Sequence, residues 1–325
     1  VLDFCFYKFA FIMISLKINN EYAQLKTVVL GIAKDFGGTP KIDDCYDPKS
    51  REYVKNGSFP VEESLVNELN QFLKVFKKYN VDVLRPDNIK NLNQVFSRDI
   101  AFVIDNKIII PNIINERKKE IDGVESIIEK IDSKNIVILS EESSIEGGDI
   151  IVHNEDIFIG YSNNEDFDKY QVARTNEKAV LDIKDLFPKK NIFAFELKKS
   201  DRDPKENALH LDCCFQPIGK GMAILYEGGF KNKSDITLLE SYFGTNNLIR
   251  ITKEEMYNMN SNVFSISENV IVSEKNFYRL NSILRESGFY IEEINFSEIA
   301  KMESLLRRIT LPLIRFWNEL LIISS

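Results

Sequence analysis

The sequence predicts a mixed α/β fold in which five similar units surround one central pocket. Each unit is expected to contain two short strands, a helix and a further strand. The first observation is a strand–turn–strand pattern that recurs four times along the 325 residues. The second is that a helix-like stretch and another apolar segment follow each copy. The third is a more divergent copy that can be assembled near the N-terminus.

The four recurring hairpins each join two apolar segments through a polar turn. Their strands cover residues 101–104 and 108–110, 150–152 and 157–159, 215–218 and 222–225, and 263–266 and 270–272. After the last hairpin, apolar side chains fall on one helical face over residues 275–287, and a strand follows over 290–296. The turn Gly219-Lys220-Gly221 lacks the spacing of a phosphate-binding loop, so we interpret it as a hairpin turn.

The fifth unit combines a strand over residues 27–32, a helix over Glu62–Lys78 and a strand over 81–84. That helix begins with two glutamates and ends with two lysines, which matches the helix dipole at both ends. Strand pairs that alternate with helices argue against a kelch-type β-propeller, whose blades lack helices. In such an arrangement, residues at corresponding strand ends would converge on the central pocket.

The composition is that of an ordinary globular protein. Hydrophobic residues make up 44% and charged residues 28% of the chain, and 42 basic against 50 acidic residues give a net charge of −8. No dense basic stripe is present, so we expect no nucleic-acid partner. Four cysteines without a CxxC spacing and two histidines predict neither a disulfide scaffold nor a metal site, and no cofactor is expected.

We expect one domain over residues 18–315, with a leader of doubtful status over 1–17 and a tail over 316–325. The first sixteen residues are apolar, but Asp3 and Lys8 interrupt them, which fits neither a membrane span nor a signal peptide. A targeting segment is the alternative to a translated leader before Met13. We therefore expect a cytoplasmic protein without a membrane partner, and the apolar ends would allow a homo-oligomer.

Three polar clusters precede hairpins at similar points of their units. They are Phe-Ser-Arg-Asp (96–99), Glu-Gly-Gly-Asp (146–149) and His-Leu-Asp (210–212). If the units are related by pseudo-symmetry, one cavity holds Asp99, Glu146, His210 and Asp212. Three carboxylates there would repel one another unless a cation entered the cavity. A guanidinium suits it, because a planar group with several donors can pair with carboxylates in a bidentate way.

Each cluster also has a purely structural interpretation. Asp99 could bridge to its neighbour Arg98 on a solvated edge, and Gly147-Gly148 could be a tight turn. His210 could be a structural histidine with satisfied hydrogen bonds, and His153 is expected at the surface in a hairpin turn. The shared position of the three clusters in their units favours the functional interpretation.

Four motifs, in this order, resemble the guanidine-modifying superfamily, which includes arginine deiminases, dimethylarginine dimethylaminohydrolases and amidinotransferases. They are Phe-Ser-Arg-Asp (96–99), Ile-Glu-Gly-Gly-Asp (145–149), Asn-Ala-Leu-His-Leu-Asp-Cys-Cys-Phe-Gln-Pro (207–217) and Met-Asn-Ser-Asn-Val (259–263). The resemblance covers nearly the whole domain. It implies the pentein fold, an α/β propeller of five pseudo-symmetric units, and a small guanidino compound of the arginine type as substrate or ligand.

In that family a cysteine attacks the guanidinium carbon, and a histidine moves the protons. The resemblance assigns the histidine role to His210 and its orientation to Glu146. Two carboxylates are implied to hold the substrate guanidinium, and an arginine is implied to hold the substrate carboxylate. The residues expected to bind the substrate are Asp99, Asp149, Arg174 and Asp212.

The sequence departs from the family at the nucleophile. The family pattern near the C-terminus resembles Glu-Gly-Leu-Leu-Arg-Cys-Ser-Thr, whereas residues 303–310 are Glu-Ser-Leu-Leu-Arg-Arg-Ile-Thr, so Arg308 stands at the cysteine position. A guanidinium is always protonated and cannot act as a nucleophile, so the chain is expected to be inactive or strongly impaired. Cys214 is a remote substitute, because it would approach from the same wall as His210, and Cys5 and Cys45 look incidental.

Two interpretations of Arg308 stay open. Its guanidinium could enter the pocket as an internal substrate mimic, or the substitution could be without a role in a degenerate gene copy. The alternatives to an impaired enzyme are a non-catalytic protein that binds arginine or methylarginine and a partner of an active paralogue. Hydrolase and transferase activity are not distinguished by the sequence.

Overall fold

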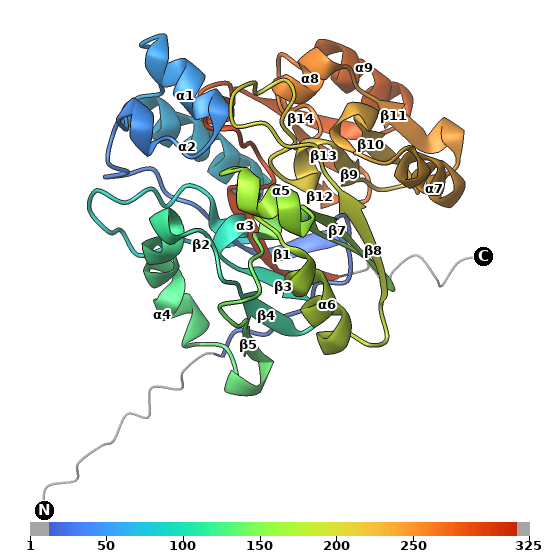
Figure 1. Ribbon diagram of the computed structural model, residues 1–325, viewed down its shortest axis with the longest axis horizontal. Helices are drawn as coiled ribbons and strands as arrows, with labels where there is room; N and C mark the ends of the chain where they lie inside the picture. The colour runs from blue at the N-terminus through green and yellow to red at the C-terminus, as the bar shows by residue number, and fades with distance from the viewer. Residues whose placement is uncertain (1–12, 317–325) are drawn as a thin grey trace, which may run out of the picture.

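The computed structural model describes residues 13–316. It contains five three-stranded sheets, and the central strand of each sheet is antiparallel to one neighbour and parallel to the other. Figure 1 shows the units following one another around the molecule, from the blue α1 and α2 through green and yellow to the orange α8 and α9. The expected α/β propeller of five units is therefore confirmed.

The strands are short, and each sheet takes three of them. They are β1 (Gln24–Leu30), β2 (Asp82–Leu84), β3 (Phe102–Ile104), β4 (Lys107–Ile110), β5 (Ile136–Ile138), β6 (Ile150–His153), β7 (Asp156–Tyr161), β8 (Asn191–Glu196), β9 (Phe215–Pro217), β10 (Ala223–Leu225), β11 (Leu248–Arg250), β12 (Phe264–Ser267), β13 (Val270–Glu274), β14 (Tyr290–Ile294) and β15 (Thr310–Phe316). The sheets have the orders β15-β1-β2, β3-β4-β5, β6-β7-β8, β9-β10-β11 and β12-β13-β14.

The helices lie between the strands of each unit or lead into them. They are α1 (Pro48–Lys55), α2 (Glu62–Lys78), α3 (Ser97–Ile100), α4 (Glu125–Ile128), α5 (Asn164–Lys169), α6 (Glu177–Leu186), α7 (Lys233–Phe243), α8 (Lys253–Tyr257) and α9 (Tyr278–Glu286). None of the helices within residues 13–316 is long and apolar enough to cross a membrane.

The four predicted hairpins are present as β3–β4, β6–β7, β9–β10 and β12–β13. The turn between β9 and β10 closes with a hydrogen bond from Ile218 N to Met222 O of 2.8 Å. Lys220 and Gly221 both adopt positive φ values there, of 62° and 69°. The interpretation of this segment as a hairpin turn is confirmed.

The predicted helix Glu62–Lys78 is α2, with the same limits. Its apolar face is buried, and the rings of Phe72 and Phe76 lie 5.6 and 5.9 Å from the ring of Phe264 in β12. Aromatic contacts of this kind add to the free energy of burying the rings, and they hold α2 against the last unit. This helix therefore links the first unit to its neighbour.

The first unit is completed by the C-terminal strand, which the sequence did not place there. β15 runs antiparallel to β1, and its register pairs Gln24 with Phe316 and Leu30 with Thr310. β15 lies at the edge of its three-stranded sheet, and a proline such as Pro312 is tolerated better in an edge strand than in a central one. The pairing brings the loop that carries Arg308 into the centre of the molecule.

The expectation that His153 lies at the surface is wrong. It is the last residue of β6 and is only 7% exposed. Its ring lies 5.4 Å from the rings of both Tyr22 and Phe243. The hairpin turn is polar, as predicted, but the N-terminal segment and α7 cover the imidazole beside it, and no local pattern indicates such a cover.

Both ends of the described chain contact the propeller. Ile14 N donates to Lys130 O at 2.7 Å, and Lys17 N donates to Leu313 O at 2.8 Å. Leu16 between them is buried. Cys5 and most of the expected leader and tail lie outside the described residues.

Candidate active site

The three polar clusters occupy equivalent positions on single helical turns that lead into β3, β6 and β9. Asp99 lies on α3, Glu146 precedes the turn Gly147–Asp149, and His210 precedes the turn Leu211–Cys213. Each of the three residues offers one oxygen or nitrogen atom that could bind a metal ion, and these atoms lie within 4.8 Å of one another. All three side chains are almost completely buried, with exposures of 0 to 1%. The structure thus brings together the residues that the shared repeat position singled out.

The guanidinium of Arg308 lies directly on the carboxylate of Asp99. Nε and Nη2 donate to Oδ1 and Oδ2 at 3.2 and 2.7 Å, and Nη1 donates to the carbonyl of Glu303 at 2.6 Å. Burial alone would raise the pKa of Asp99, but the guanidinium groups of Arg308 and Arg117 outweigh it and hold that pKa below its usual range. The carboxylate therefore stays ionised in a fully buried ion pair.

Arg98 does not pair with Asp99. The alternative interpretation, in which the two residues form an ion pair on a solvated edge, is therefore wrong. Its Nε donates to Thr310 O at 2.9 Å, and its Nη1 lies 3.5 Å from the carboxylate of Glu21. Arg98 is itself buried. The side chain ties the first cluster to β15 and leaves Asp99 to face the centre.

Arg117 is a second guanidinium at the centre, and the sequence did not reveal it. Its Nη1 donates to Asp99 Oδ2 at 2.9 Å and to Glu146 Oε2 at 3.1 Å, while Nε and Nη2 bind Glu120 at 3.0 and 2.8 Å. It lies in the run Asn-Glu-Arg-Lys-Lys-Glu, which is typical of a solvated segment, yet Arg117 is only 2% exposed. Burial raises the pKa of Glu120 to about 7, although Arg117 lowers it.

His210 lies beside Glu146, the carboxylate expected to orient it. Nε2 is 3.0 Å from Glu146 Oε2, yet neither ring nitrogen has a hydrogen-bond partner within residues 13–316. Burial, reinforced by the charge of Arg308, lowers the pKa of the imidazole well below its usual value. A neutral, unpartnered imidazole next to a carboxylate can accept a proton, which general acid–base chemistry requires.

The two glycines of the second cluster allow the units to pack closely. A Cβ on Gly148 would lie 2.7 Å from His210 Cγ, and one on Gly147 would lie 2.0 Å from the carbonyl oxygen of Arg98. Only glycine leaves room for these contacts. The Gly-Gly step therefore serves the approach of three neighbouring units at the site.

Asp212 is central, but its carboxylate is engaged by a neighbour of Arg308. Arg307 Nη1 donates to Asp212 Oδ2 at 2.8 Å, and Arg307 Nη2 donates to Glu21 Oε1 at 3.0 Å. Burial raises the pKa of Asp212, and the charges of Arg307 and Arg308 act against that rise. The sequence indicated Asp212 but not these partners.

Arg174 and Asp149 lie beside the centre with their polar atoms bound inside the protein. Arg174 donates to the carbonyls of Gln171 and Tyr46 at 2.5 and 2.9 Å, and its Nε is 3.5 Å from Glu146 Oε1.

The carboxylate of Asp149 accepts from Thr175 Oγ1 at 2.6 Å and from Leu211 N at 2.9 Å. Burial raises the pKa of Asp149 to about 7. These contacts connect the second and third clusters.

The cysteine that could replace a nucleophile points elsewhere. Cys214 is fully buried in an apolar cluster, and its thiol lies 3.4 Å from the carbonyl of Leu211. Burial raises the pKa of Cys214 well above its usual value, so the thiol stays protonated. Cys213 is also buried, with its pKa raised for the same reason.

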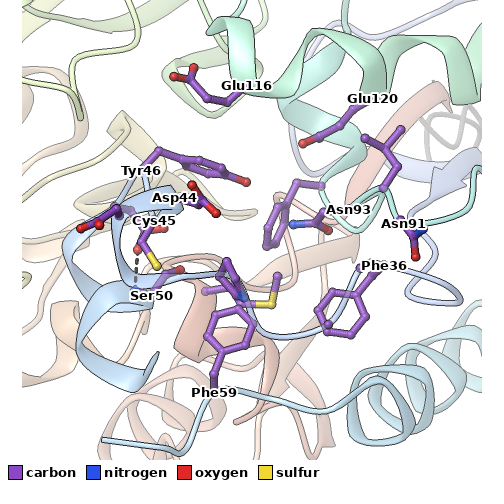
Figure 2. A pocket seen from close by; sticks show the side chains of 18 of the residues that line it. Phe36, Asp44, Cys45, Tyr46, Ser50, Phe59, Asn91, Asn93, Glu116 and Glu120 are labelled. Carbon is purple, nitrogen blue, oxygen red and sulfur yellow. Dashed lines mark hydrogen bonds between the residues drawn. The ribbon is translucent and has the colours of Figure 1, made fainter. Parts of the chain in front are cut away.

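A cavity of about 570 Å³ lies next to the guanidinium groups of Arg117 and Arg308. Phe96 and Glu120 line it on the side of the two guanidinium groups, and the guanidinium carbons of Arg117 and Arg308 lie 5.8 and 5.7 Å from the Phe96 ring centre. Figure 2 shows Glu116 and Glu120 on one side of the space and Phe59 on the other.

Asp99, Glu146 and His210 are ligand types that a metal ion could use. Arg117 and Arg308 already bind the two carboxylates, and their positive charges would repel a metal ion. At the centre, the carboxylates of Asp99 and Glu146 therefore have guanidinium groups as partners in place of a metal ion.

Residues 49–299 match the family described as N,N dimethylarginine dimethylhydrolase, eukaryotic. The chain belongs to this family, which is part of the pentein superfamily of guanidine-modifying proteins.

Relatives with known sequences agree with this assignment. The uncharacterized protein YkgA of Bacillus subtilis strain 168 is 28% identical over 249 residues, which are 76% of this chain and 79% of YkgA. An arginine deiminase of Bacillus cereus strain ATCC 10987 is 27% identical over 270 residues. The match covers 69% of this chain and 62% of the deiminase, so the chain spans less than two thirds of that relative.

Solved structures share the fold. SxtG, an amidinotransferase from Microseira wollei, superposes with a TM-score of 0.72 at 16% identity, covering 92% of this chain and 97% of SxtG. The N-terminal domain of the cyanobacterial arginine dihydrolase ArgZ, bound to its substrate, has a TM-score of 0.74 at 16% identity, covering 89% and 98% of the two chains.

Proposed function

We propose that this protein is an amidinotransferase- or dimethylarginine dimethylaminohydrolase-like protein for arginine-type guanidino compounds, and that Arg308 at the nucleophile position leaves it with little or no activity. The observation that carries the proposal is the buried bidentate pair of Arg308 with Asp99. The family resemblance assigns Asp99 to the substrate guanidinium. A guanidinium of the protein itself thus lies where the ligand's guanidinium would be held, as a substrate mimic would.

The proposed loss of activity follows from the chemistry. In a competent site a thiolate adds to the guanidinium carbon, the bond to one nitrogen breaks, and the imidazole supplies a proton to the leaving amine. Water then adds to the thiouronium carbon, the carbon–sulfur bond breaks, and a ureido product leaves. Arg308 offers no electron pair for the first step because its pKa is raised further by Asp99 despite the opposing effect of burial. His210 and Glu146 would still be present as the acid–base pair.

The test compares the parent protein with Arg308→Cys and Arg308→Ala. Each would be assayed with L-arginine and with N,N-dimethylarginine, scoring ureido product together with ammonia or dimethylamine. We expect turnover by the cysteine variant only, since the alanine variant empties the guanidinium position without supplying a thiol. Turnover by the parent would contradict the proposal. A folded cysteine variant without turnover would show that the substrate assignment is wrong.

The second candidate is a binding protein without catalysis, and the cavity beside the buried pair favours it. Micromolar binding of arginine or methylarginine by the parent without turnover, measured by calorimetry, would support it. A third possibility is that the protein is a partner of an active paralogue, and co-purification of the two proteins would support it.

We also propose a cytoplasmic location, which the free thiols of Cys45, Cys213 and Cys214 favour. Fractionation of cells that express the full chain would test it. Whether the protein is a homo-oligomer would follow from its mass in solution by light scattering.

A further inference from the structure

The cavity beside the candidate active site is lined by negative charge. Its walls contain five carboxylates and no lysine, arginine or histidine within the described part of the chain. The carboxylates are those of Asp43, Asp44, Asp47, Glu116 and Glu120. Aromatic rings and amides make up much of the remaining wall, including Phe36, Tyr46, Phe59, Asn91 and Asn93 (Figure 2).

Most of this charge is not compensated. Glu120 is paired with Arg117. For the other four carboxylates, no ion pair is found within residues 13–316, and only Asp47 is buried, accepting a hydrogen bond from Ser50 N at 2.6 Å. A cavity with four carboxylates that lack an ion pair attracts cations and disfavours anions.

The cationic side chains that contact the cavity wall are bound to other groups. Arg117 pairs with Glu120, and Arg51 donates to the carbonyls of Cys45 and Asp201 at 2.8 and 2.7 Å. Arg174 lies behind Tyr46, and both of its terminal nitrogens donate to backbone carbonyls. The Nζ of Lys49 donates to the backbone carbonyl of Tyr257 and lies 4.5 Å from the centre of the Tyr257 ring. A carboxylate on a ligand would therefore find no positive partner in the cavity, and placing it among carboxylates would cost free energy.

Polar groups of the candidate active site lie behind the inner wall of the cavity. Phe96 and Glu120 form part of that wall, and Arg117 behind it binds both Glu120 and Glu146. Oε1 of Glu146 and both ring nitrogens of His210 are buried without a hydrogen bond in the described chain, although Arg174 Nε lies 3.5 Å from that Oε1 and Glu146 Oε2 lies 3.0 Å from His210 Nε2. Buried polar atoms without a hydrogen bond are rare, and a polar ligand could satisfy them. The cavity and these atoms together fit a ligand with a guanidino end inside and a second end among the carboxylates.

We propose that the ligand of this site is a guanidino compound whose other end is an amine or a neutral group and carries no carboxylate. This inference rests on the proposed function and names the substrate class within it. An alkyl chain of a few carbons would contact Phe59 and Phe36, and an ammonium group would be stabilised by the acidic wall and by the face of Tyr46. The α-carboxylate of arginine, by contrast, is the part of that molecule that the cavity does not match.

The experiment measures binding of three probes by calorimetry, to the parent and to Arg308→Ala, in which the guanidinium position is vacated. The probes are L-arginine, L-arginine methyl ester and 4-aminobutylguanidine, which is arginine without its carboxylate. We expect the ester and 4-aminobutylguanidine to bind at least tenfold more tightly than L-arginine. Binding of L-arginine as tight as, or tighter than, the other two would overturn this inference alone. Binding of none of the three by either folded protein would overturn the proposed function as well.

A charge variant tests whether the acidic wall causes the preference. The double variant D44N/E116Q removes two exposed carboxylates of the cavity, and it should reduce the preference for 4-aminobutylguanidine over L-arginine several-fold. The double variant E125Q/E129Q, which removes two exposed carboxylates outside the cavity, is the matched control and should leave the preference unchanged. An equal effect of both variants would mean that net charge, and not the wall, sets the selectivity.

Discussion

Arg308 and Asp99 form two parallel contacts of 3.2 and 2.7 Å although 209 positions separate them in the sequence. The pairing depends on the closure of the propeller, because β15 crosses to the first unit and carries the loop before it to the centre. Arg117 binds the same carboxylate from the second unit, so Asp99 lies between two guanidinium groups. The resulting cluster is compact and buried, and several properties of the protein should depend on it.

Removing Arg308 should destabilise the protein. Arg308→Ala leaves the buried Asp99 with one guanidinium instead of two, and breaking a buried pair costs about 3–5 kcal/mol. Equilibrium unfolding in urea measures the loss. Arg285→Ala is the control, because its pair with Glu293 is half exposed and should contribute less than about 1 kcal/mol.

If Arg308 acts as a substrate mimic, a small guanidinium compound should replace it. Millimolar methylguanidine is expected to raise the thermal midpoint of Arg308→Ala by several degrees and to leave that of the parent almost unchanged. Equal shifts in both proteins would show that the vacated position does not bind guanidinium. If Arg308→Ala lowers the free energy of unfolding only slightly, the substitution at this position would be one without a role.

The imidazole of His210 should be neutral at pH 7 and should respond to residue 308. Burial and the positive charge of Arg308 hold its pKa well below 6.5, and burial also lowers the pKa of His153. NMR titration of the two histidines reports both values, and a His153→Phe variant assigns them. In Arg308→Cys the pKa of His210 should rise, because one of the causes of its depression is gone. A value near 6.5 for His210 in the parent would contradict the buried environment.

Asp149 should make stability fall as the pH rises through the weakly acidic range. Its pKa is about 7 in the folded protein and about 3.8 in the unfolded chain, so unfolding releases a proton between these values. The contribution of Asp149 to the free energy of unfolding is therefore largest below pH 4. It decreases between pH 4 and pH 7, with a slope that approaches about 1.4 kcal/mol per pH unit. Urea unfolding of Asp149→Asn at several pH values should show a smaller decrease than the parent. An unchanged slope would mean that Asp149 is ionised in the fold.

Gly148 should not tolerate a side chain. The Cβ of Gly148→Ala would lie 2.7 Å from Cγ of His210, whose side chain is completely buried. We expect a loss of about 1–3 kcal/mol in the free energy of unfolding, as for other overpacked sites. In the control Gly228→Ala the nearest atoms belong to the half-buried ring of Tyr226, which can move aside, so the loss should be smaller.

The sequence by itself determined the repeated architecture and the three polar clusters. Hairpins and the amphipathic α2 leave a local signal, because strand alternation, turn residues and helical periodicity act over a few positions. The same locality explains why Asp99, Glu146 and His210 were identifiable, since each stands at one point of a repeat. The departure at position 308 was identified in another way, because only the resemblance to the family pattern indicated that a cysteine is expected where Arg308 stands.

Only the tertiary structure decided the partners of these residues. Arg117 lies in a charged run that looks solvated, and it becomes buried because its unit packs against the centre. The completion of the first sheet by β15, the burial of His153 and the pairing of Arg307 with Asp212 likewise depend on segments far apart in the sequence. Ion pairs and cavity walls of this kind are set by where the units meet. A local pattern therefore indicates which residues reach the centre, whereas the folded chain decides which charges they meet there.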